Sequence, residues 1–132
     1  SGLDHVESGQ PLAAADTNRM LFVDGAQDWA GYAEAKPLAD PPGSAFRYST
    51  ATTMILADIA TRMLTDSEDP DRRRGAMTTF IDGRLKAPVG LASLTPEFDA
   101  RGTLGGGSFM HMTARDYARF GEFLRNRGRA QG

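Results

Sequence analysis

The clearest hydrophobic pattern in the chain runs from Ser49 to Leu64, where apolar residues recur at steps of three and four positions. The apolar positions are Ala51, Met54, Ile55, Ile59, Ala60, Met63 and Leu64, with the polar residues Asp58, Thr61 and Arg62 between them. This spacing is typical of an amphipathic helix, and it predicts the longest helix of the chain.

Weaker patterns predict shorter helices before it. Residues 16–23 and 29–35 carry the same kind of spacing, and Asp28 is a candidate N-cap for the second segment. Residues 39–43 contain two prolines and a glycine, which favour a loop because neither residue type continues a helix.

Two further helices are expected in the second half. One covers about residues 72–85, after a polar break at 66–71, and ends at the Ala87–Gly90 segment. The other opens at Thr113, where Thr113 to Asp116 resembles a capping box with aspartate in place of glutamate. Its apolar face consists of Tyr117, Phe120, Gly121 and Leu124. Between these helices, residues 91–112 are expected to form a long loop with short extended pieces near 109–112.

Composition supports a mainly α fold in a single domain, residues 1–132. The chain has 40% hydrophobic residues, and its 15 glycines and seven prolines fall between the periodic segments, which predicts helices joined by long ordered loops. The formal net charge of −2 gives no overall basic field for nucleic acid. Without cysteine the chain has neither disulfides nor thiolate metal sites, and its compartment stays undetermined.

No targeting or membrane segment is expected within the chain. No apolar run approaches the roughly 20 residues that a membrane-spanning helix needs. The first five residues also lack the basic and apolar regions of a signal peptide.

Tyr48 is the main candidate for chemistry, because it stands at the entry to the longest predicted helix. A phenol has an unperturbed pKa of about 10, so it acts as a base near neutral pH only when a nearby cation lowers that pKa. No lysine close in sequence supplies this cation. The ordinary alternative is a half-buried aromatic residue with its hydroxyl at the surface.

Four segments, taken in order, resemble motifs of the penicillin-recognising serine hydrolase superfamily, in its class C β-lactamase-like and esterase branch. They are Ser1-Gly2-Leu3, the Pro42 to Ser49 segment with Tyr48, the Arg84 to Leu91 segment with Pro88 and Gly90, and Gly105 to Ser108 followed by Met112 to Gly121. The first is similar to the end of a Thr-Ser-Gly-Leu turn, and the second to the segment that carries the catalytic tyrosine of the family. Each motif alone is a weak signal, whereas the order of all four is specific.

The resemblance implies that the chain is the mostly helical inserted domain of a β-lactamase-like α/β hydrolase. The Ser-x-x-Lys motif of the family and its Lys-Thr-Gly or His-x-Gly strand have no counterpart here, since no serine precedes a lysine by three positions. The expected partners are therefore the missing α/β domain and a small ester or amide substrate, with no nucleic acid, membrane or cofactor. By itself the chain is expected to be inactive.

The same resemblance implies roles for individual residues. Tyr48 would be the catalytic proton shuttle, Thr50 would contact the substrate, and Gly106, Gly107 and Ser108 would border the cleft. Thr50 occupies the position of an asparagine in the lactamases, and a hydroxyl replaces an amide's separate donor and acceptor groups. This difference favours the esterase and 6-aminohexanoate-dimer hydrolase branch.

Alternatives of other classes remain open. A non-catalytic binding or regulatory module with the same fold is the main one, and a helical nucleic-acid-binding domain is suggested by the arginines between 115 and 129. Arg72, Arg73 and Arg74 are expected on a solvated face. His5 and His111 lie far apart and lack metal-ligand spacing, so no metal is expected.

The last expectations concern which large apolar residues are buried and which are exposed. Trp29 and Tyr32 are expected to pack in the core or to line an acyl-binding cleft. Leu104, Phe109 and Met110 are candidates for an exposed face that would meet the α/β domain.

Overall fold

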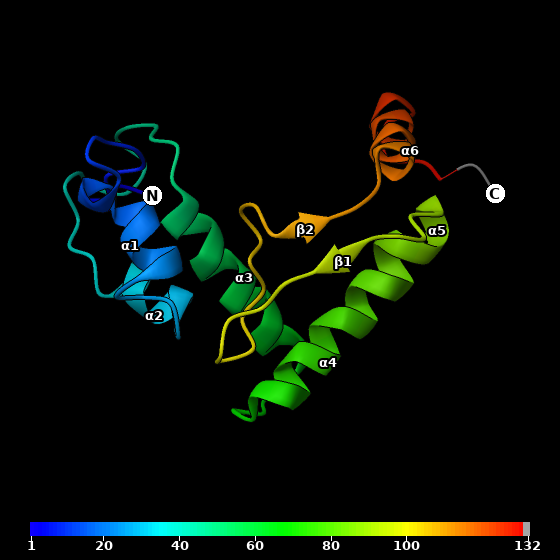
Figure 1. Ribbon diagram of the computed structural model, residues 1–132, viewed down its shortest axis with the longest axis horizontal. Coiled ribbons are helices and arrows are strands. Elements are labelled where there is room, and N and C mark those ends of the chain that lie inside the picture. The colour runs from blue at the N-terminus through cyan, green and yellow to red at the C-terminus, as the bar shows by residue number, and fades with distance from the viewer. Residues whose placement is uncertain (131–132) are drawn as a thin grey trace.

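The computed structural model describes residues 1–130, and their fold is mainly helical with little sheet (Figure 1). The helical elements are η1 (Leu12–Ala14), α1 (Asp16–Phe22), α2 (Trp29–Glu34), α3 (Thr50–Leu64), α4 (Pro70–Ile81), η2 (Asp82–Lys86), α5 (Ala87–Val89) and α6 (Ala114–Arg125). Two short strands, β1 (Thr95–Pro96) and β2 (Met110–His111), pair in antiparallel register. The mainly α prediction is confirmed.

The N-terminal half forms a first core around Met20 and Trp29. Helices α1 and α2 pack against the first half of α3, which contributes Ala51 and Met54 to this core (Figure 1). Asp28 caps α2 as predicted, since its carboxylate accepts a hydrogen bond from the Gly31 amide at 2.8 Å. Trp29 is 7% exposed and belongs to this core, as one of the two sequence interpretations predicted.

The second half of α3 belongs to a second core, which it shares with α4 and the long loop. The buried members of this core are Ala57, Met77, Ile81, Leu91, Leu94 and Leu104. Because α3 contributes to both cores, it joins the two halves of the chain, as its central position in Figure 1 shows.

Helix α4 begins earlier than the predicted start at about residue 72. Asp69 caps it by accepting from the Arg72 amide at 2.9 Å, and Pro70 takes the first helical position, where its missing amide costs nothing. The helical path then continues through η2 and α5 and ends at Gly90, whose φ of 74° is left-handed.

The long loop from 91 to 112 is ordered by a buried carboxylate. Asp99, which is 4% exposed, accepts hydrogen bonds from the amides of Trp29, Arg101 and Thr103 at 2.9, 3.0 and 2.8 Å. Burial raises the pKa of Asp99, and the three amides oppose that rise. The predicted extended piece near 109–112 is present as β2, whereas its partner β1 was not predicted.

The apolar face predicted for α3 is wrong in its second half. Ile59 and Met63 are 47% and 82% exposed, whereas the polar residues Asp58 and Thr61 are buried. Asp58 is buried in an ion pair with Arg73 of α4, in which both side chains are 5% exposed.

The prediction that Arg72, Arg73 and Arg74 lie on a solvated face is wrong for Arg73, which is buried. Its Nε donates to the Arg101 carbonyl at 2.9 Å, and the Thr103 hydroxyl donates to Asp58 at 3.3 Å. The ion pair therefore ties α3, α4 and the long loop together.

Helix α6 starts at the predicted position, but its capping box is only half formed. The Thr113 hydroxyl accepts from the Asp116 amide at 3.4 Å, while the Asp116 carboxylate accepts from the Ser93 amide and hydroxyl at 2.7 and 2.6 Å. These Ser93 hydrogen bonds lower the pKa of Asp116. Tyr117 and Leu124 of the predicted apolar face are 53% and 58% exposed.

Replacing Arg73 with methionine is predicted to reduce the free energy of unfolding by about 3 kcal/mol, because the buried Asp58 carboxylate loses its buried partner and keeps only Arg62, whose side chain is 62% exposed. Urea unfolding measures this loss. Arg72→Met is the matched control, since Arg72 is an exposed neighbour on the same helix, and it should change stability by less than about 0.5 kcal/mol. Equal losses in both variants would contradict the assigned role.

Candidate functional site

The predicted site lies where the chain enters α3. Residues 41–48 are exposed, and the loop is held by a turn in which the Ser44 amide and hydroxyl both donate to the Pro41 carbonyl. Arg47 pairs with Asp40 at 2.6 Å. Ser49 then caps α3 by accepting from the Thr52 amide at 3.2 Å. Tyr48 is thus placed directly before an ordered helix start.

The Tyr48 side chain is 70% exposed, and its hydroxyl hydrogen-bonds to none of the described residues. Both lysines of the chain are engaged elsewhere. Lys36 pairs with Asp16 at 2.5 Å, and Lys86 lies 3.7 Å from Asp82. Neither lysine is therefore positioned to assist the phenol in this arrangement.

Thr50 is buried at the first position of α3. Its amide donates to Glu7 Oε2 at 2.8 Å, and its hydroxyl donates to the other oxygen of the same carboxylate. Thr50 is 4% exposed, so a substrate contact would require its hydroxyl to leave Glu7. Glu7 is the residue that sequence reasoning missed, because it lies 43 positions away and no local pattern marks the contact.

The glycine loop packs on the same part of α3. A Cβ atom added to Gly107 would lie 3.1 Å from Thr50 Cγ2, and one added to Gly106 would lie 3.4 Å from the Ala57 Cβ. The structure thus brings Gly107 against Thr50, two residues after Tyr48, and Gly106 against α3 further along, at Thr53 and Ala57.

Ser108, the next residue after this loop, lines a mostly apolar groove. The groove is lined by Leu85, Gly106, Gly107, Ser108, Met110, Met112, Tyr117 and Phe120. Phe109 turns the opposite way and stacks on Trp29, with ring centroids 5.2 Å apart and an interplanar angle of 12°. Phe109 and Leu104, which were both expected on an exposed face, are therefore packed inward. Phe109 packs against the first core, and Leu104 is only 9% exposed.

The N-terminal segment borders the site from the other side. The Gly2 carbonyl accepts from the amides of Ala39 and Asp40 at 2.9 and 3.2 Å, and the Ser1 and Thr52 hydroxyls lie 2.6 Å apart. The first residues thereby join the loop before Tyr48 to the first turn of α3.

His5 lies behind Glu7 in this segment. Its side chain is fully buried, its Nε2 is 2.9 Å from the Thr17 hydroxyl and 3.4 Å from Glu7, and its Nδ1 has no partner among the described residues. Burial lowers the pKa of His5, and the charges of Glu7 and Asp16 only partly offset this. His5 is therefore neutral in the folded protein at pH 7.

Asp16 completes the cluster around His5. Burial disfavours its charge, but hydrogen bonds from Lys36 and from the Val6 amide outweigh burial and lower the pKa of Asp16. Lys36 also lies 5.2 Å from the centre of the Tyr32 ring. This network fixes the N-terminal segment on α1 and α2.

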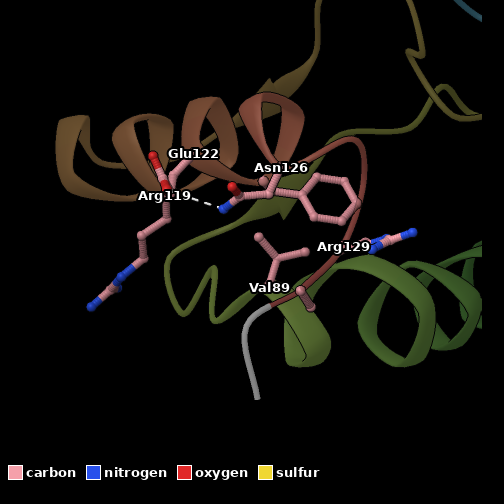
Figure 2. A pocket seen from close by; sticks show the side chains of 7 residues that line it. Val89, Arg119, Glu122, Asn126 and Arg129 are labelled. Carbon is pink, nitrogen blue, oxygen red and sulfur yellow. Dashed lines mark hydrogen bonds between the residues drawn. The ribbon is translucent and has the colours of Figure 1, made fainter.

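A second hollow lies between α5 and α6 (Figure 2). Its polar side chains are largely engaged with their own neighbours: Asn126 donates to Glu122 at 3.0 Å, and Arg119 donates to Asp116 and to the Gly90 carbonyl at 2.8 and 3.2 Å. The hollow shares no residue with the Tyr48 region, and we assign it no function.

Within residues 1–130, no three histidine, aspartate or glutamate side chains gather as metal ligands would. Over the same range no helix has the length and apolarity to span a bilayer.

Gly2→Ala is predicted to destabilise the protein more than Gly43→Ala does. Both glycines have left-handed φ values, 85° and 84°, so each alanine costs about 1–2 kcal/mol in backbone energy. Only at Gly2 would the added Cβ also lie 2.3 Å from the Asp40 carbonyl oxygen, whereas Gly43 has open space. Urea unfolding should show roughly 1–3 kcal/mol of additional loss for Gly2→Ala. Equal losses would mean that the Gly2 contact is dispensable.

The neutral state of His5 predicts a pH dependence of stability. A folded pKa below the usual 6.5 means that the unfolded chain takes up a proton first as the pH falls. The His5 contribution is complete above pH 6.5 and is lost as the pH falls from 6.5 through the folded pKa. Unfolding free energies measured between pH 7.5 and 5 should decline in the native protein.

His5→Gln should flatten this decline, whereas the exposed His111→Gln should retain it. A decline of the same size in His5→Gln would show that other groups cause it.

Comparisons of the chain with protein-family models, with curated proteins and with solved structures gave no match.

Proposed function

We propose that this chain is the helical domain of a penicillin-recognising-type serine hydrolase, in which Tyr48 moves the proton during ester or amide hydrolysis. The observation that carries the proposal is the placement of Tyr48. Its phenol is exposed at an ordered helix start, and the glycine loop packs two residues away on Thr50. A proton-transfer group needs to be accessible to the substrate.

The engaged lysines support a site shared with another part of a longer protein. A phenol needs a cation to work as a base near pH 7. Lys36 and Lys86 have carboxylate partners, so the cation would come from a Ser-x-x-Lys segment outside these residues.

In the proposed reaction the Tyr48 oxygen takes the proton of the nucleophilic serine hydroxyl. The serine oxygen attacks the carbonyl carbon, and the bond to the alcohol or amine leaving group then breaks. Tyr48 gives its proton to that leaving group, which leaves an acyl-enzyme. Water then attacks the acyl-enzyme, with Tyr48 again taking and giving the proton, and the serine is released together with the free acid.

The exposed apolar side chains fit a surface that an α/β domain would cover. They are Leu56, Ile59 and Met63 on one side of α3 and Phe46 beside Tyr48, with exposures of 58%, 47%, 82% and 95%. Several exposed apolar side chains on one face of a helix are typical of an interaction site.

The substrate-facing residues of this proposal are Gly106, Gly107 and Ser108. They line the apolar groove, whose two methionines and two aromatic rings suit an apolar substituent of the substrate. Thr50 would reach the substrate only after releasing Glu7.

Tyr48→Phe is predicted to lower kcat/KM by about 10²–10⁴-fold in the protein that includes the flanking segments, because proton transfer is lost. Hydrolysis of a p-nitrophenyl ester measures this. Tyr32→Phe is the matched control: it removes a phenol hydroxyl bonded to Asp16, away from the proposed chemistry, and should retain activity. Full activity of Tyr48→Phe would refute the proposal.

The chain alone should give no burst and no acyl adduct with the same ester, and a stoichiometric adduct on one of its serines would contradict the proposal. Flanking coding sequence without Ser-x-x-Lys would favour the non-catalytic module instead.

A further inference from the structure

The start of α3 is held by a carboxylate from a distant segment. The first amides of a helix lack partners within the helix. At α3, Ser49 satisfies the Thr52 amide and Glu7 satisfies the Thr50 amide. A negative charge is favourable here because the helix N-terminus carries partial positive charge.

Glu7 accepts hydrogen bonds from two groups of Thr50. One carboxylate oxygen accepts from the Thr50 amide and the other from the Thr50 hydroxyl, so both backbone and side chain are fixed. On another side, Gly107 approaches the Thr50 methyl group so closely that an added Cβ would lie 3.1 Å away. Thr50 is therefore immobilised between Glu7 and the glycine loop.

Tyr48 has no comparable anchor of its own. Its side chain is mostly exposed, and its hydroxyl contacts no hydrogen-bonding partner among residues 1–130. The location of the phenol then depends on where α3 begins, which is two residues further on. Glu7 holds that point together with the Ser49 cap and the packing of Gly107.

We propose that Glu7 is a positioning residue for Tyr48: its carboxylate fixes Thr50, and through Thr50 it sets where the phenol stands. This inference rests on the proposed function.

The test is a double-mutant cycle in the protein that includes the flanking segments, assayed with a p-nitrophenyl ester. Glu7→Ala should lower kcat roughly 10–100-fold with little change in KM, because small misplacement of a reacting group slows the chemical step. Glu7→Gln keeps an acceptor oxygen for the Thr50 amide and should recover a large part of that loss. Glu34→Ala, which changes an exposed glutamate of α2, should behave as the native protein.

The decisive variant combines Glu7→Ala with Tyr48→Phe. If Glu7 acts through Tyr48, the double variant is no slower than Tyr48→Phe alone. Losses that multiply, or a Glu7→Ala kcat equal to that of the native protein, would overturn the positioning role. A purely structural role would lower the unfolding free energy without this non-additivity.

The cycle also separates this inference from the proposed function. A fully active Tyr48→Phe would overturn both. An impaired Tyr48→Phe beside a fully active Glu7→Ala would overturn the role of Glu7 alone. If Glu7→Ala fails to fold, the cycle is run with Glu7→Gln, whose partial loss must likewise vanish in the Tyr48→Phe background.

Discussion

The arrangement of the chain depends on the buried ion pair between Asp58 and Arg73. It connects α3 with α4, and through the Arg101 carbonyl and the Thr103 hydroxyl it also holds the long loop. Leaving one of these charges buried without its partner would cost several kcal/mol. The face of α3 that carries Asp58 and Thr61 is buried, and Ile59 and Met63 are 47% and 82% exposed.

Carboxylates that accept from backbone amides, each including at least one amide far away in the sequence, recur in this protein. Asp99 binds three amides, Asp116 binds Ser93, and Glu7 binds Thr50. Hydrogen bonds to ionised acceptors are stronger than neutral ones. They give long glycine- and proline-containing segments a defined path without regular secondary structure, so loops can hold functional groups in place.

The proposed site combines rigidity with access. Glu7 and Gly107 fix Thr50 on two sides, while Tyr48 next to it stays exposed. Gly106, Gly107 and Ser108 of the glycine loop also line the apolar groove. In the proposed enzyme, a second domain would add the nucleophile and the cation to a tyrosine whose place this domain has already set.

The sequence by itself determined the approximate positions of the five longer helices and the caps at Asp28 and Thr113, because helix periodicity and capping act over a few residues. It also located the glycine loop. Only the tertiary structure decided which face of α3 is buried, that Arg73 lies inside, and that Glu7 holds Thr50. These contacts join residues 15 and 43 positions apart, and such distances leave no local pattern in the chain.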